Sequence, residues 1–251
     1  MRNIVTEAVI LRKYRVGEIH KGLKIFSPSL GIVNVIAHGA YRMRNRFRIV
    51  TEPFSYSLLY LYLNPVAGSY KLTDVEAKNL FEGIRGNIKK FYIASLWSEI
   101  IMESKAGGSD FEILFNLFVR ALSILDKISK SSTFALLSIQ FLWKFLKLTG
   151  YLPALEICSK CGRRIEGEEE IFYSPIDASL FCSLCKNENH LPLTRGARAY
   201  IKKTGDMDLS DSIGIGLESK SVDSLKNFLY LRIQKQLDVS LKTLESGRNF
   251  L

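Results

Sequence analysis

The sequence predicts an α+β protein in which a small antiparallel barrel precedes an α-helical domain that carries an inserted metal-binding knuckle. Three observations lead to this fold class. Short runs rich in β-branched residues, separated by turn signals, fill residues 1–75. Beyond them, apolar residues recur with the period of a helix. Between the later helical patterns stand two cysteine pairs of identical spacing, 158–161 and 182–185, and they contain all four cysteines of the chain.

The first segment contains five stretches with the composition and alternation of strands. Residues 27–31, with Pro28 and Gly31, form a natural hairpin connection between the second and third of them. Five short antiparallel strands in so few residues fit a closed or nearly closed barrel, and we expect an OB-fold barrel over residues 1–76. The expected strands are residues 6–14, 23–27, 31–37, 55–63 and 69–75.

From about Val75 the apolar period changes from 2 to 3.6, which predicts a helical domain over residues 77–251 with a knuckle inserted at 154–190. The inward faces of its first two helices are expected to carry Ile84, Ile88, Phe91, Tyr92, Ser95, Leu96 and Ile100 in one, and Ile113, Leu114, Leu117, Phe118, Ala121, Leu125 and Ile128 in the other.

Capping and stop signals place the remaining helices. A last amphipathic helix is expected to run from about residue 221 to 244. Aromatic residues at helical spacing are usually core, so Trp97 and Trp143 are interpreted as packing residues. The signals are Asp110 as the cap of the second helix, Ser131 or Ser132 as the start of the third, Gly150 and Pro153 as its stop, and Thr194 as the cap of a short basic helix.

The two cysteine pairs predict a structural Zn²⁺ site. Each C-x₂-C turn directs two thiolates to one point, and two such turns complete a tetrahedron. The 20 residues between the pairs lie at the upper end of the usual spacing. Two disulfides or four unrelated thiols are the alternatives, but scattered cysteines rarely fall into two identical spacings. A site closed by Cys158, Cys161, Cys182 and Cys185 leaves no open position for chemistry, so its role is expected to be structural.

Charge and hydropathy narrow the class of protein further. The formal net charge is +10 and the sequence pI about 9.4. Residues 1–80 hold 12 Lys and Arg against 5 Asp and Glu, so a polyanionic partner such as nucleic acid is expected, with solubility as the alternative explanation. No apolar run approaches the roughly 18 residues of a membrane span, and the N-terminus carries no signal region. We therefore expect a cytoplasmic protein, associated with the nucleoid.

A basic segment, residues 38–48, follows the third expected strand. Arginine at every second position places the guanidinium groups on one side if the segment is extended, and Tyr41 and Phe47 supply rings for stacking. An OB barrel with such a connection commonly tracks a single-stranded phosphate backbone without reading bases; a solvated loop is the alternative. Arg15 and Lys21 could extend the surface. The principal nucleic-acid contacts are expected to be Arg12, Lys13, Lys24, Tyr41, Arg42, Arg44, Arg46 and Arg48.

The sequence contains no recognisable catalytic motif. A Walker loop, HExxH, GxSxG and a close carboxylate pair beside a histidine are all missing. We therefore expect no catalytic residues and no enzyme activity. Two other readings stay open: a metal-dependent nucleic-acid enzyme with an appended zinc ribbon, and a zinc-bearing scaffold that binds RNA.

Several short motifs, in this order, resemble the RecO family of bacterial recombination-mediator and DNA-repair proteins. The resemblance spans nearly the whole chain. Departures are His20, residues 44–47, and Glu52 where Gln is usual; they leave the charge pattern intact. The matching stretches are Val16-Gly17-Glu18 before residues 23–27, Gly31, residues 37–42, Glu52-Pro53-Phe54, residues 150–153 before Cys158, Cys161-Gly162, and residues 244–248.

The resemblance implies binding of single- and double-stranded DNA, annealing of complementary strands, and loading of the RecA recombinase onto strands coated by single-strand binding protein. It also implies partnership with RecR and with the acidic C-terminal tail of the single-strand binding protein. The tail needs a basic groove on the helical domain. Charge alone suggests Lys144, Lys147, Arg198 and Lys202 for it.

Overall fold

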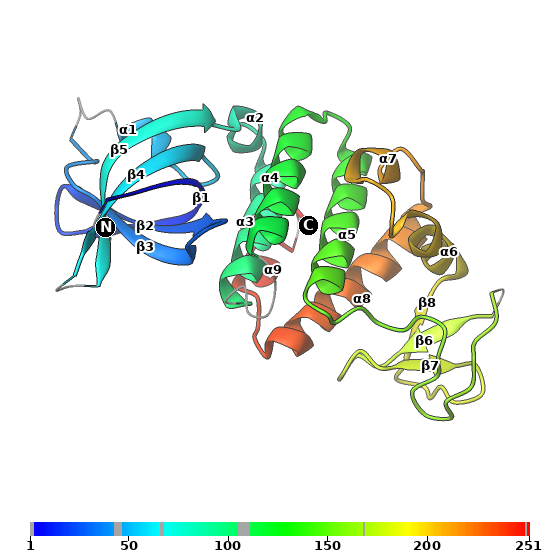
Figure 1. The fold of residues 1–251 in the computed structure, drawn as a ribbon. Coiled ribbons are helices and arrows are strands. Elements are labelled where there is room, and N and C mark those ends of the chain that lie inside the picture. Colours follow the sequence, from blue (N-terminus) through cyan, green and yellow to red (C-terminus); the bar gives the residue numbers. More distant parts are fainter. Residues whose placement is uncertain (1–2, 43–46, 66–67, 105–110, 168, 249) are drawn as a thin grey trace. The chain divides into compact units, whose positions relative to one another are not determined.

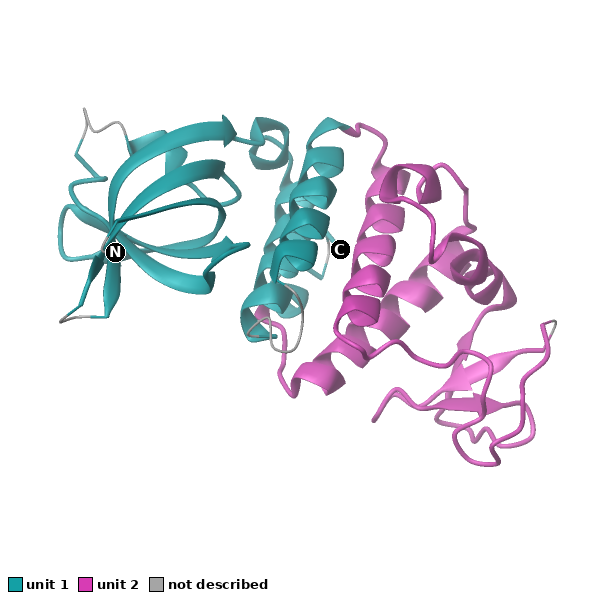
Figure 2. Cartoon of the chain, in the orientation of Figure 1, with its two compact units in different colours: residues 1–127, 243–251 teal, residues 128–242 magenta. Residues whose placement is uncertain are grey.

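The computed structural model describes residues 3–42, 47–65, 68–104, 111–167, 169–248 and 250–251. The chain forms two compact units (Figure 2): one contains residues 1–127 and 243–251, the other residues 128–242. No described helix has the length and apolar character needed to cross a membrane. The division into an OB domain ending near residue 76 and one helical domain stays a prediction.

The first unit begins with a closed five-stranded barrel in the order β1-β2-β3-β5-β4 (Figure 1). Neighbouring strands are antiparallel except β3 and β5, which pair in parallel through Val35–Tyr70 and Ile36–Lys71. Each of the five predicted strands is present, so the predicted barrel is confirmed. The strands are β1 (Asn3–Val16), β2 (His20–Ser27), β3 (Gly31–Ala37), β4 (Tyr56–Asn64) and β5 (Ser69–Asn79).

Strand β5 continues beyond Val75, where the sequence predicted a change to helix. Its last residues still pair with β4, Val75 with Leu59 and Asn79 with Tyr56. The segment after Val75 contains no β-branched residue, so the strand there depends on its partner rather than on local propensity. The barrel interior is filled by inward side chains of all five strands: Ala8, Ile10, Leu23, Ile25, Val35, Ala37, Leu59, Leu61 and Leu72.

A buried ion cluster joins helix α1 (Phe47–Val50) and the following turn to the barrel. The Lys21 side chain is 1% exposed. Its Nζ donates to Glu52 Oε1 at 2.8 Å, to Thr51 Oγ1 at 3.1 Å and to the Arg48 carbonyl at 2.9 Å. Lys13 Nζ lies 2.5 Å from the other Glu52 oxygen. Lys21 is therefore part of the core, and its predicted place on the exposed basic surface is wrong.

The Glu52 carboxylate makes the stability of the barrel depend on pH. Burial raises the pKa of Glu52, but hydrogen bonds and charge from Lys13 and Lys21 outweigh it, so the pKa lies below its ordinary value of 4.5. A lowered folded-state pKa stabilises the fold above the unfolded pKa, and this contribution is lost as the pH falls through the folded one. We expect Glu52→Gln to lower the free energy of unfolding by about 2 kcal/mol at pH 7, and we expect this difference to shrink as the pH falls below 4.5 through the lowered folded-state pKa of Glu52.

Thermal unfolding of parent and Glu52→Gln between pH 3 and 7 measures this effect. Glu18→Gln is the matched control, because Glu18 is an exposed carboxylate of the same barrel. Identical pH profiles for the Glu52 and Glu18 variants would contradict the role assigned to Glu52.

Helices α2 (Glu82–Arg85), α3 (Ile88–Glu103) and α4 (Phe111–Lys127) follow the barrel in the first unit. The Asn87 side chain caps α3 by accepting from two backbone N–H groups. α3 packs on both β1 and α4, so it buries two sides. Trp97 is fully buried, as predicted, but Ile88, Phe91 and Ile113, predicted to point inward, are 55%, 38% and 52% exposed. The predicted cap Asp110 lies outside the described residues.

The second unit packs α5 (Ser131–Leu148) against α8 (Ser219–Leu237) and α7 (Leu209–Ser212), while α6 (Arg195–Thr204) packs on α8. A small sheet, β7-β6-β8, consists of β6 (Ile171–Tyr173), β7 (Leu180–Cys182) and β8 (Leu191–Leu193). The predicted cap is confirmed, because the Thr194 side chain accepts from the Ala197 N–H. Trp143 is buried, as predicted.

The last predicted helix, residues 221–244, is two helices. α8 ends where Asp238 adopts a left-handed conformation with φ 52°, and α9 (Lys242–Ser246) begins four residues later. The Gln234 side chain accepts from the Leu241 N–H at 3.2 Å and so stabilises the break. The apolar period continues across the break since Leu241 is also buried, which is why the sequence pattern did not reveal it.

Candidate metal centre and nucleic-acid interface

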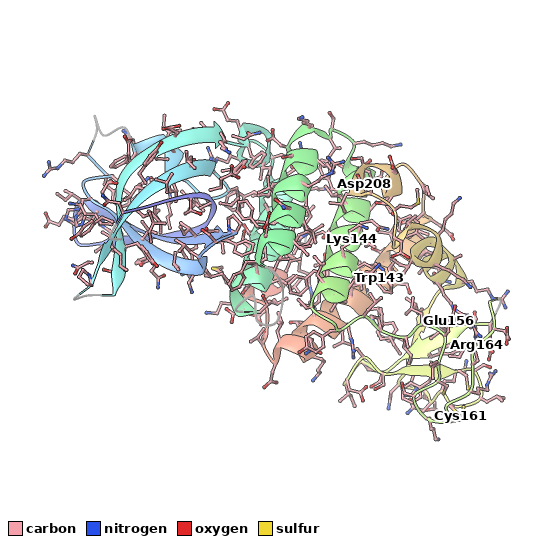
Figure 3. The ribbon with its side chains drawn as sticks, in the orientation of Figure 1. Trp143, Lys144, Glu156, Cys161, Arg164 and Asp208 are labelled. Carbon is pink, nitrogen blue, oxygen red and sulfur yellow. The ribbon has the colours of Figure 1, made fainter. Side chains whose placement is uncertain are left out.

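The four cysteines come together in the second unit, and the Cys161 side chain is labelled in Figure 3. All four Sγ atoms lie within 4.8 Å of one another, and Cys161 Sγ is 3.9 Å from Cys182 Sγ. A disulfide requires about 2.05 Å between sulfurs, whereas a tetrahedral ion with bonds of about 2.3 Å holds them about 3.8 Å apart. The cluster therefore has the size of a four-thiolate metal site and can hold one ion.

Backbone turns hold the cysteines in place. Gly162 has φ +70°, a conformation that disfavours a side chain, and its N–H donates to the Cys158 carbonyl at 2.9 Å. In the second pair, the Cys185 N–H donates to the Cys182 carbonyl at 3.1 Å. The Cys182 N–H lies 3.4 Å from Cys158 Sγ and links the two turns. Amides directed at sulfur stabilise a thiolate.

The ionisation of the thiols also fits a cation. Burial raises the pKa of Cys158, but backbone N–H groups of Cys161, Cys182 and Lys160 outweigh it and lower the pKa to about 6. Burial and hydrogen bonding with the other three thiols raise the pKa of Cys185 to about 12. Four thiols in one place cannot all ionise on their own, because the negative charges repel one another. A soft divalent cation relieves that repulsion.

Arg198, predicted as a partner-binding residue, instead fastens the knuckle to α6. It is 6% exposed, and its guanidinium donates to the carbonyls of Ile165 at 2.5 Å, Glu166 at 2.5 Å and Glu169 at 3.3 Å. Such a buried guanidinium holds structure and offers nothing to an incoming ligand. Lys202, on the same helix, is exposed and lies 3.4 Å from Glu156, which Arg164 also contacts (Figure 3).

The other two predicted partner-binding residues lie on α5, where Figure 3 labels Lys144. Lys144 Nζ donates to the carbonyls of Gly205 at 3.2 Å and Met207 at 2.5 Å, and burial lowers its pKa. Lys147 is exposed and pairs with Asp206. Lys144 and Lys147 therefore both contact the segment between α6 and α7, whereas Arg198 and Lys202 contact the knuckle.

In the basic segment, the structure describes residues 38–42 and 47–48, and the predicted contacts Arg44 and Arg46 lie outside the described residues. Tyr41 is 39% exposed, and its ring centroid is 5.2 Å from Lys21 Nζ. Arg42 is exposed. Arg48 is exposed but helical, so the predicted extended alternation does not reach it. Phe47 is buried against the barrel core and is not available for stacking.

On the barrel wall, Arg12 of β1 and Lys24 of β2 are direct cross-strand partners. Like charges opposite each other are destabilising unless an anion lies between them. Among the described residues neither has an acidic partner, whereas Lys13 is paired with Glu52. Arg12 and Lys24 are thus two adjacent cations on the barrel wall.

A hollow of about 690 Å³ on the barrel was not predicted from the sequence. It lies where β3, β4 and β5 meet. The one sequence signal for this hollow was the pair Tyr60 and Tyr62, which stand two residues apart in β4. Its lining includes Ile36, His38, Tyr62, Asn64, Tyr70 and Lys71.

A closed barrel of the OB type, a helical region and a four-cysteine knuckle define a class of proteins. Its members combine a basic barrel with a helical part that carries a cysteine cluster able to hold a metal ion. Comparison with known families identifies the member of this class. Residues 1–81 match the family model "Recombination protein O N terminal" and residues 85–245 match "Recombination protein O C terminal". The chain belongs to the RecO family of DNA repair proteins, which confirms the resemblance found in the sequence.

Individual relatives agree with this assignment. The chain is 28% identical over 217 residues to the DNA repair protein RecO of Rubrobacter xylanophilus, covering 85% of each protein. It is 26% identical over 249 residues to the RecO of a Thermoanaerobacter species, covering 97% of this chain and 96% of that protein. It is 34% identical to the RecO of Syntrophobacter fumaroxidans over 165 residues, 66% of this chain and 64% of that protein.

Proposed function

We propose that the protein is a non-catalytic recombination mediator that binds single- and double-stranded DNA and anneals complementary strands. The observation that carries the proposal is the pairing of Arg12 with Lys24 across β1 and β2, since two adjacent cations favour a bound phosphate. Arg42 and the ring of Tyr41 extend the cationic surface beyond β3. Together they suit a nucleic-acid backbone.

Annealing by such a surface needs no catalytic residue. Lysine and arginine side chains screen the repulsion between two phosphate backbones, and base pairing supplies the free energy. We further propose that the metal is Zn²⁺, because four thiolates in a closed tetrahedron are its usual structural ligands. The ion would hold the knuckle in its fold, with Arg198 fastening the knuckle to α6.

We also propose that the second unit binds RecR and the acidic C-terminal tail of the single-strand binding protein, and so acts on RecA indirectly. The decisive experiment is a pull-down with full-length single-strand binding protein and with a form that lacks the tail, followed by an annealing assay. Capture only of the full-length form, together with faster annealing, is expected. Metal-dependent cleavage of DNA would favour a nucleic-acid enzyme instead, and strong preference for RNA over single-stranded DNA at matched salt would favour an RNA-binding scaffold.

For the acidic tail, Lys147 and Lys202 are the exposed candidates, whereas Lys144 is half-buried. Each of the two exposed lysines pairs with a carboxylate at the surface, and exposed ion pairs contribute little to the stability of a fold, so an acidic peptide can displace them. We expect Lys147→Glu/Lys202→Glu to weaken binding of a tail peptide roughly tenfold at low salt, measured by fluorescence anisotropy.

Lys203→Glu/Lys220→Glu is the matched control, because both lysines are exposed in the same unit and the change in net charge is the same. Equal weakening by both variants would assign the effect to net charge and would refute the proposed tail site.

A further inference from the structure

The hollow on the barrel wall combines flat rings with a cation. Lys71 of β5 pairs with Ile36 of β3 on one side and with Tyr62 of β4 on the other. Side chains directly opposite in neighbouring strands share a face, so these three form a row across the sheet. The residues that alternate with them, Val35 and Leu61, are buried in the core, which places the row on the outer wall.

Polar groups complete the lining at the same end of the barrel. Asn64 brings an amide that can both donate and accept hydrogen bonds. His38 lies at the other side, and burial, with the charges of His20 and Lys71, lowers its pKa. The imidazole is therefore neutral at physiological pH and is a hydrogen-bonding group, which leaves Lys71 as the cation of the hollow.

His38 links the hollow to the turn that carries the proposed backbone contacts, because it lines the hollow and begins that turn. The His38 and His20 rings meet edge to face, with centroids 4.7 Å apart. His20 Nδ1 accepts from the Gly39 N–H at 2.9 Å, and the next residues of that turn are Ala40, Tyr41 and Arg42. Arg42 thus stands four residues after a residue that lines the hollow, and we expect one bound strand to contact both.

We propose that this hollow accepts an unpaired nucleobase, stacked on Tyr62, while Lys71 contacts the adjoining phosphate. The inference rests on the proposed DNA-binding function and adds a part to it that contacts bases. The aromatic rings suit a base, the amide suits its hydrogen-bonding edge, and the lysine suits a phosphate, all within one space of about 690 Å³. In a duplex the bases are paired and stacked inside, so this contact is available only to a single strand.

Substitution of the ring tests the proposal. We expect Tyr62→Ala to weaken binding of a single-stranded deoxythymidine oligonucleotide between about fivefold and about a hundredfold, because a base loses its stacking partner. Tyr62→Phe keeps the ring and should bind like the parent, and binding to a duplex of equal length should not change. Tyr60→Ala is the matched control: Tyr60 is on the same strand and face, outside the hollow, and bonded to Glu76.

A second measurement does not depend on the variant folding. The parent should bind an abasic oligonucleotide more weakly than the deoxythymidine oligonucleotide, while folded Tyr62→Ala should bind the two alike. Equal affinity of the parent for both oligonucleotides would overturn this inference but not the proposed function. So would an equal loss of affinity for single strands and for duplex in Tyr62→Ala. Absence of any single-strand binding by the parent would overturn the proposed function as well.

Discussion

Reversal of three charges, in the variant Arg42→Glu/Arg44→Glu/Arg46→Glu, is expected to lower the affinity for single-stranded DNA by roughly a hundredfold at about 0.1 M salt. Each cation that neutralises a phosphate releases counterions on binding, and this release contributes roughly a factor of five to ten per contact at that salt. Glutamate removes the contact and adds repulsion. Arg42 is exposed, and no fold contact of its side chain is found among the described residues, so thermal unfolding should be unchanged.

The salt dependence gives a second, independent readout. For single strands the slope of log K against log salt changes by about 0.7 per phosphate contact, so the variant should lose about 2 from the slope of the parent. Fluorescence anisotropy titrations at four salt concentrations measure both quantities. Because the contact is with the backbone, oligonucleotides of different sequence should lose affinity to the same extent.

The matched control reverses three exposed lysines of the other unit, Lys130→Glu/Lys203→Glu/Lys220→Glu, and so makes the same change in net charge. It should keep most of the affinity of the parent. Parent-like binding by the arginine variant, or equal loss in the two variants, would show that the segment after β3 is not the contact surface.

The barrel was predictable from the sequence because alternation and turn residues are local. Side chains whose environment depends on distant residues were not. From the sequence, Lys21 was predicted to be a surface cation, because only the fold brings Glu52 of the α1–β4 turn beside it. Phe47 was assigned to stacking for the same reason, since one helical turn directs it into the barrel core. The charged and aromatic residues of a segment indicate what it could bind, but their burial decides whether a ligand can reach them.

The helices, too, could be predicted from the sequence only in part. A single inward face was predicted for the helix that contains Ile88 and Phe91, whereas α3 contacts the barrel on one side and α4 on another. Likewise, the apolar period runs through Asp238 without a proline or glycine to mark the end of α8. Periodicity indicates which long segments are helical and their approximate places. It does not reveal a break with a side-chain cap or a helix with two buried sides, because these depend on the tertiary structure.

Some parts of the candidate site could be predicted from the sequence and others could not. The four-cysteine cluster was predictable because two pairs of identical spacing define two turns whose sulfur atoms can meet at one point. The role of Arg198 was not, because its three carbonyl acceptors belong to an irregular segment. The hollow beside Tyr62 depends on the parallel pairing of β3 with β5, which closes the barrel and which no local pattern predicts.

Removal of two ligands in Cys158→Ser/Cys161→Ser is expected to reduce bound metal from about one ion per chain to almost none and to unfold the knuckle. Serine has nearly the size of cysteine, but its hydroxyl is not ionised at neutral pH and does not replace a thiolate. The proposed metal would hold residues 158–185 in place, and the carbonyls that bind Arg198 belong to this segment. The unit of residues 128–242 should therefore lose at least about 4 kcal/mol of unfolding free energy.

Native mass spectrometry measures the bound ion, and limited proteolysis followed by mass spectrometry locates the unfolded segment, with new cleavage expected between residues 154 and 193. Ser183→Ala is the matched control, because Ser183 is an exposed neighbour of Cys182 and contacts only Glu169 among the described residues. A metal-free variant that resists protease like the parent would show that the cluster does not depend on an ion.

The same variant separates structure from DNA binding. The barrel, with Arg12, Lys24 and Arg42, belongs to the other unit and has its own core. Because the barrel has a core of its own, we expect single-strand affinity to stay within about twofold of the parent. If the metal-free protein keeps the barrel folded, by the thermal transition of that unit, and still loses DNA affinity, then the knuckle itself contacts DNA. In that case the metal centre would be part of the interface rather than its support.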